Sequence, residues 1–88
     1  MIEKTAKVVN KLGIHARPAS LIVQTAIKFK SSIQLIKDGA SADAKSIMSV
    51  MMLAAAQDSS VVVRAEGADE EAAAEAIVRL FEMKFNEE

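Results

Sequence analysis

The three glycines of this 88-residue chain, at positions 13, 39 and 67, mark where its strand-like segments end. Alternating apolar and polar residues around Ala6 and Val8 indicate a short strand before the first glycine, and the valine-rich "SVVVRAEG" ends at the third. Between them, apolar residues flank Asp38-Gly39, a pair that readily forms a two-residue hairpin turn. These patterns predict four strands, two of them joined as an antiparallel hairpin.

Helical periodicity fills the intervals between these strands. Ser46 can cap a short helix, "SIMSVMMLAAAQ", and "ADEEAAAEAIVRLFEMKF" after Gly67 has acidic residues in its first turn and one apolar stripe. In residues 16–29 the apolar side chains fall on one broad helical face, which consists of Ala19, Ile22, Val23, Ala26, Ile27 and Phe29.

The order of these segments is β-α-β-β-α-β-α, which predicts an α+β fold. We expect an open-faced β-sandwich in which a four-stranded antiparallel sheet carries three helices on one face. A chain of this length buries one hydrophobic core, so residues 1–88 are expected to form a single domain.

Composition excludes several classes of function. The chain has no cysteine and one histidine, so we expect no disulfide, no metal site and no cofactor. It has no stretch of roughly 18 apolar residues and no apolar signal segment, which predicts a cytoplasmic protein without membrane insertion. Three phenylalanines, with neither tyrosine nor tryptophan, do not supply the stacking surface of an RNA-binding domain, and we expect no nucleic-acid partner.

The stretch "LGIHARPAS" contains both the only histidine and the only proline. His15 lies where a strand gives way to a helix, and Pro18 suits the first helical turn because its missing N–H would have no partner there. The unpaired N–H groups and partial positive charge of a helix N-terminus favour a phosphoryl group, to which Arg17 can add charged donors. The same positive end favours a neutral, nucleophilic imidazole. A structural or merely exposed histidine is the alternative.

Charge is distributed unevenly along the chain. Residues 1–50 contain eight Lys or Arg against three Asp or Glu, whereas residues 51–88 contain three against nine. The basic half contains the histidine and is expected to attract anions or acidic proteins, although scattered solvated lysines explain the pattern as well. Because the chain has no nucleotide-binding loop and no base with an orienting partner, we expect a carrier of a group supplied by others and not an enzyme.

Three motifs in register resemble the histidine-containing phosphocarrier family, HPr, of the bacterial phosphoenolpyruvate:sugar phosphotransferase system. They are "GIHARPAS" at 13–20, "AKSIMSVM" at 44–51 and "EGADE" at 66–70, and the resemblance covers essentially the whole chain. It implies that His15 accepts a phosphoryl group on Nδ1 from phosphorylated Enzyme I and passes it to a histidine of an EIIA domain during sugar uptake. It also implies that Arg17 steadies the phosphohistidine and that the chain acts as a monomer.

The resemblance implies a second site at Ser46, which an HPr kinase/phosphorylase modifies in many bacteria and a transcriptional regulator can then recognise. Ile47-Met48 after the serine is similar to the regulated branch of the family, but Ser49, Ala54 and Asp58 stand where glycine is common. Two alternatives remain open. The serine can be only a helix cap, or the chain can be a regulatory relative that acts through this serine and protein binding without sugar transport. Regulatory relatives such as Crh lack the histidine.

An apolar docking surface is also expected. Leu21 lies opposite the buried face of the first predicted helix and is expected to meet solvent, whereas the second helix is apolar nearly all round. Val50 and Leu53 are expected to pack in the core. The resemblance implies that these two helices lie side by side next to the histidine, so the predicted partner-binding residues are Leu21, Gln24, Ile47, Met48 and Met51.

Overall fold

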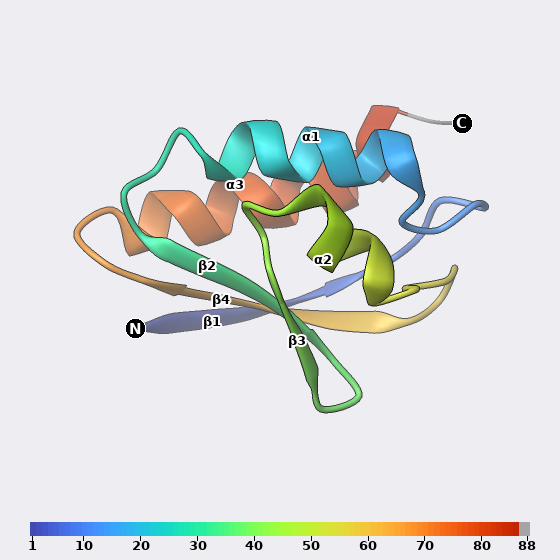
Figure 1. The fold of residues 1–88 in the computed structure, drawn as a ribbon, viewed down its shortest axis with the longest axis horizontal. Helices are drawn as coiled ribbons and strands as arrows, with labels where there is room; N and C mark the ends of the chain where they lie inside the picture. The colour runs from blue at the N-terminus through green and yellow to red at the C-terminus, as the bar shows by residue number, and fades with distance from the viewer. Residues whose placement is uncertain (87–88) are drawn as a thin grey trace.

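The structure is a computed structural model that describes residues 1–86. It confirms the predicted order of strands and helices, with a short turn, η1 (Lys84–Asn86), after the last helix (Figure 1). The elements are β1 (Ile2–Lys7), α1 (Ala16–Ala26), β2 (Ser32–Lys37), β3 (Ala40–Asp43), α2 (Ile47–Met52), β4 (Ser60–Glu66) and α3 (Glu70–Glu82).

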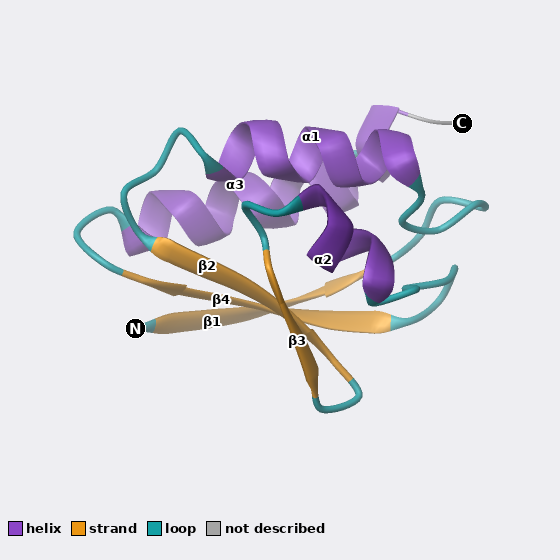
Figure 2. Cartoon of the chain, viewed as in Figure 1, coloured by secondary structure: helices purple, strands orange, loops and turns teal. Residues whose placement is uncertain are grey.

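The strands form one antiparallel sheet in the order β1-β4-β2-β3. β4 occupies a central position, where Val62 lies opposite Thr5 on one side and Ile36 on the other. All three helices cover one face of this sheet, as Figure 2 shows, and the other face is open. The predicted open-faced β-sandwich is therefore confirmed.

The core lies between the sheet and its helices. Strand alternation turns Val61, Val63 and Ala65 of β4 inward, and each is almost fully buried. The helices contribute Ile22 from α1 and Phe81 from α3, and burying side chains of this size stabilises a fold by about 1.5–3 kcal/mol each. This core fixes the α1 layer above the sheet.

Two connections show how local chemistry supports this arrangement. Asp38 (φ 51°) and Gly39 (φ 83°) both adopt the left-handed conformation, as the predicted hairpin between β2 and β3 requires. Before α3, the Asp69 carboxylate accepts hydrogen bonds from the backbone N–H groups of Lys30 and Ser31, each at 2.9 Å, and from the Ser31 hydroxyl. These donors, led by the Ser31 hydroxyl and then the Lys30 amide, lower the pKa of Asp69 to about 2.

Helix α1 ends earlier than the sequence predicts. It stops at Ala26, and Ile27, expected on the buried face, is 61% exposed. The next amides, of Lys28 and Phe29, donate to carbonyls only three residues back. That spacing shows that the α-helical hydrogen-bond pattern ends just after Ile27.

Candidate functional site

His15 is the residue at the N-cap of α1, in an extended conformation (φ −99°, ψ −164°). Its carbonyl accepts the first helical hydrogen bond from the Ala19 amide at 3.0 Å. Its side chain is partly exposed and does not cap the helix. The imidazole therefore stands beside the N-terminus of α1.

The loop before His15 is held by contacts to the segment that follows α2. The Ile14 amide donates to the Ala55 carbonyl at 2.9 Å, and the side-chain amide of buried Asn10 donates to the Gly13 carbonyl at 2.7 Å. Gly13 has φ 69°, and a Cβ there would lie 2.5 Å from the Ala55 oxygen. Only glycine fits this close approach. Contacts distant in sequence thus set the position of His15.

The first turn of α1 is suited to an anion. The amides of Ala16 and Arg17 open the helix, so no carbonyl within α1 can accept from them, and Pro18 has no N–H. The first turn contains no acidic residue, and the Arg17 side chain is exposed. The structure therefore brings His15 together with Arg17 and the positive end of an 11-residue helix.

Ser46 lies at the N-cap of α2, as predicted. Its Oγ accepts a hydrogen bond from the Ser49 amide at 3.3 Å, and its carbonyl accepts from the Val50 amide at 3.0 Å. Helix α2 packs against α1 and β3. The serine thus begins a short helix that lies beside the helix carrying Arg17.

Helix α2 presents an apolar surface that matches part of the predicted docking surface. Its exposed members line one shallow groove and are Ile47, Met48, Met51 and Met52. Val50 and Leu53 are buried, as expected. The prediction left out Met52, although its position four residues after Met48 places both on one helical face.

The α1 part of the predicted docking surface differs in detail. Leu21, expected to meet solvent, is instead partly buried and packs against the core. Gln24 is exposed and donates from Nε2 to the Ser20 hydroxyl at 3.0 Å. The apolar part of the surface therefore belongs mainly to α2.

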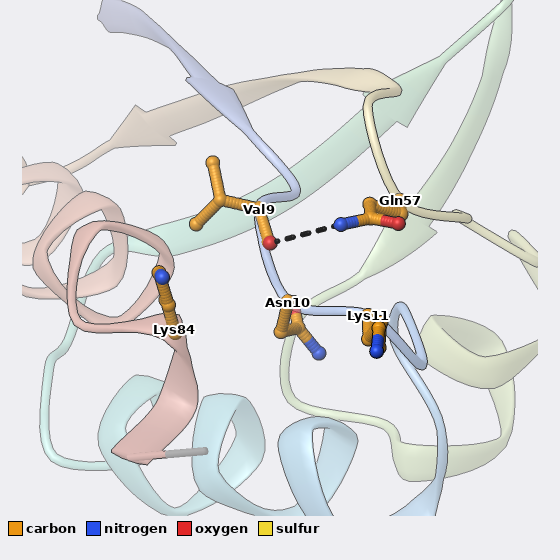
Figure 3. A pocket seen from close by; sticks show the side chains of 5 residues that line it. All are labelled: Val9, Asn10, Lys11, Gln57 and Lys84. Atoms are coloured by element: carbon orange, nitrogen blue, oxygen red, sulfur yellow. Dashed lines mark hydrogen bonds between the residues drawn. The ribbon is translucent and has the colours of Figure 1, made fainter. Parts of the chain in front are cut away.

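A second pocket, of about 230 Å³, lies beside the loop that precedes His15 (Figure 3). The Gln57 side chain crosses it to donate to the Val9 carbonyl at 3.4 Å, and Lys11 and Lys84 complete its lining with Asn10. Its residues come from three segments far apart in the chain. No local pattern in the sequence could have placed them together.

Two classes of site are not found in the described part of the chain. Residues 1–86 contain no group of three or more His, Cys, Asp or Glu side chains arranged to hold a metal ion. Within the same residues, every helix is too short or too polar to cross a bilayer.

Comparisons with known proteins agree on one family. A family model described as the PTS HPr component phosphorylation site matches residues 2–83. The chain is 52% identical over 88 residues to a phosphocarrier protein HPr of Treponema pallidum, covering all of both chains, and 48% identical to one of Xylella fastidiosa, covering 100% and 99%. It is also similar to the crystal structure of HPr-C-His from Thermoanaerobacter tengcongensis, with a TM-score of 0.95, 52% identity and coverage of 100% and 99%.

Proposed function

The chain belongs to the HPr family of phosphocarrier proteins of the phosphotransferase system, and from this premise we propose that His15 is the residue that carries the phosphoryl group. A member of this family is a carrier and not a catalytic enzyme. The observation that carries the proposal is the N-cap position of His15, which places its imidazole beside the N-terminus of α1, where an anion is favoured.

The transfer is a displacement at phosphorus. The lone pair of His15 Nδ1 attacks the phosphoryl group of phosphorylated Enzyme I, a new N–P bond forms, and the bond from phosphorus to the donor atom of Enzyme I breaks with its electron pair returning to that atom. In this proposal the amides of Ala16 and Arg17 and the Arg17 guanidinium bind the phosphoryl oxygens, a role supported by their position in the first turn of α1. The reverse sequence at an acceptor histidine returns His15 to its starting state.

Membership of the family implies Enzyme I and EIIA domains as partners. We assign their docking to the apolar groove of α2, formed by Ile47, Met48, Met51 and Met52, together with Leu21 and Gln24 of α1. A groove of exposed methionines can adapt to more than one partner. Because this surface adjoins the helix that begins at His15, one docking mode can serve both the donor and the acceptor.

Ser46 is the proposed regulatory site. Its Oγ is the atom that an ATP-dependent HPr kinase/phosphorylase would modify, and it lies at the start of the same helix that forms the docking groove. A phosphoryl group there adds about two negative charges next to Ile47 and Met48. These charges must be desolvated when Enzyme I docks, which weakens the encounter, and they offer a ligand to a transcriptional regulator with basic residues.

The test is phosphorylation by a heterologous Enzyme I and phosphoenolpyruvate, followed by intact mass measurement. We expect one phosphoryl group per chain, which acid removes and base does not. The His15→Ala chain should remain unlabelled while its circular dichroism matches that of the unchanged protein. Labelling of that variant to the same extent would exclude His15 as the acceptor.

A further inference from the structure

The methionines of the chain are concentrated on α2. Three of the five, Met48, Met51 and Met52, lie in this six-residue helix, where they are 71%, 42% and 79% exposed. The chain contains no cysteine, tryptophan or tyrosine. The thioethers of these methionines are therefore the most accessible readily oxidised groups of the docking groove.

The geometry of α2 separates these sulfurs from the core. The groove methionines share one helical face with Ile47, whereas Val50 and Leu53 on the opposite face are 1% and 8% exposed and anchor the helix. The Ser46 cap is a hydrogen bond from the Ser49 amide and involves no groove side chain. A chemical change at the groove methionines can therefore alter the surface and leave the fold unchanged.

We propose that Met48, Met51 and Met52 form a site of reversible oxidation by hydroperoxides that controls docking of Enzyme I. In each event the thioether sulfur attacks one oxygen of hydrogen peroxide, an S–O bond forms as the O–O bond breaks, and the leaving hydroxide takes the proton of the attacked oxygen and departs as water. The sulfur is oxidised by two electrons and hydrogen peroxide is reduced. A methionine sulfoxide reductase returns the thioether and water at the expense of a dithiol, which becomes a disulfide.

The consequence for docking comes from the polarity of the product. A sulfoxide oxygen on Met48 or Met52 is well solvated in the free protein and must lose water when an apolar partner surface covers the groove. The inference rests on the proposed function, in which this groove receives Enzyme I. Oxidation should thus raise the KM for the interaction and leave the chemistry at His15 unchanged.

The test uses the intact chain treated with hydrogen peroxide, after which catalase removes the oxidant. Peptide mass analysis should find one added oxygen on each groove methionine, and circular dichroism should be unchanged. The KM for phosphorylation by untreated Enzyme I should rise about tenfold to a hundredfold with little change in kcat. Reductases for both sulfoxide epimers, with dithiothreitol, should restore the original KM.

Two variants locate the effect. The Met48→Leu/Met51→Leu/Met52→Leu chain, compared with itself before and after peroxide, should show no change in KM. The matched control is Met83→Leu, which removes an exposed methionine outside the groove and should respond to peroxide as the unchanged protein does. If peroxide raises the KM of the triple variant as much as that of the wild-type protein, the sensitive residue lies elsewhere and the inference is wrong.

Other outcomes separate this inference from the function beneath it. If peroxide leaves the groove methionines unmodified, or modifies them without raising KM, the oxidation site is excluded while the carrier function stands. If the untreated chain accepts no phosphoryl group from Enzyme I, the proposed function itself is contradicted.

Discussion

The Ile14 amide donates a 2.9 Å hydrogen bond to the Ala55 carbonyl, and this bond joins the loop that carries His15 to the segment that follows α2. Gly13 lies against the same carbonyl oxygen. The position of His15, the proposed phosphoryl acceptor, thus depends on a backbone contact between segments about 40 residues apart in sequence. This relationship makes the contact open to a direct test.

Gly13→Ala should destabilise the protein and slow phosphoryl transfer. The new Cβ would lie 2.5 Å from the Ala55 oxygen in a left-handed conformation, so we expect the free energy of unfolding to fall by at least about 2 kcal/mol in urea denaturation. Gly39→Ala is the matched control, because its φ is 83° and a Cβ there meets nothing within 4 Å. It should cost about 1–2 kcal/mol and leave transfer unchanged. If Gly13→Ala and Gly39→Ala change the rate of phosphoryl transfer equally, the contact with Ala55 is not needed for transfer.

Ala54→Gly should stabilise the protein. Ala54 is exposed and has φ 51°, a conformation that disfavours alanine by about 1–2 kcal/mol and glycine hardly at all. After the entropy cost of glycine we expect a net gain of about 0.5–1 kcal/mol in the free energy of unfolding. Ala56→Gly, at an exposed residue that does not have a positive φ, should instead lower it. A loss of stability in both variants would contradict the argument from φ.

Acid should weaken the attachment between Asp69 and the segment before β2. The pKa of this carboxyl is lowered to about 2 in the folded state, chiefly by the Ser31 hydroxyl and the Lys30 amide, from an ordinary value of 3.8. Its contribution is therefore complete above about pH 4 and declines as the pH falls towards 2. Urea unfolding at a series of pH values should show the stability gap between the unchanged protein and Asp69→Asn closing over this interval. A gap independent of pH would exclude this carboxylate as its source.

Local patterns predicted the elements of this fold, but contacts between distant segments decided the details. The alternation in β4 and the Asp38-Gly39 turn are properties of a few adjacent residues, and both appear as predicted. The exposure of Ile27 and the partial burial of Leu21 depend on where α1 ends and what packs on it, which helical periodicity alone does not contain.

The candidate site shows the same division. The motif around His15 and Arg17 was recognisable because its residues are neighbours in sequence. Its attachment to Ala55 was not, because a backbone carbonyl leaves no mark in the residue pattern. The pocket between Lys11 and Lys84 was not recognisable either, because its lining residues are far apart in the sequence.

Arg17→Glu should slow phosphoryl transfer by at least about tenfold without changing the fold. The side chain is exposed in the first turn of α1, so the substitution disturbs no core contact, but it replaces a cationic donor with a charge that repels the phosphoryl group. Lys28→Glu makes the same charge change beyond the opposite end of α1 and should have a much smaller effect. Steady-state rates at two ionic strengths check this. If both variants lose activity equally and salt removes both losses, the effect comes from the net charge of the protein and Arg17 has no specific role in transfer.

Three substitutions at Ser46 separate capping from charge. Ser46→Ala removes the acceptor of the 3.3 Å bond from Ser49 and should cost about 1 kcal/mol of stability while transfer continues. Ser46→Asn and Ser46→Asp both retain a good N-cap, but only aspartate brings a negative charge to the docking groove.

We therefore expect Ser46→Asn to transfer like the unchanged protein and Ser46→Asp to show a rise of about tenfold in the KM for Enzyme I, equivalent to about 1.4 kcal/mol. Aspartate carries one charge where a phosphoserine carries about two, so the chain labelled by an HPr kinase should show the larger rise. The comparison is made at equal ionic strength, with circular dichroism showing the same helix content in all forms. If Ser46→Asp and Ser46→Asn transfer equally well and the kinase does not label the chain, the serine acts only as the cap of α2.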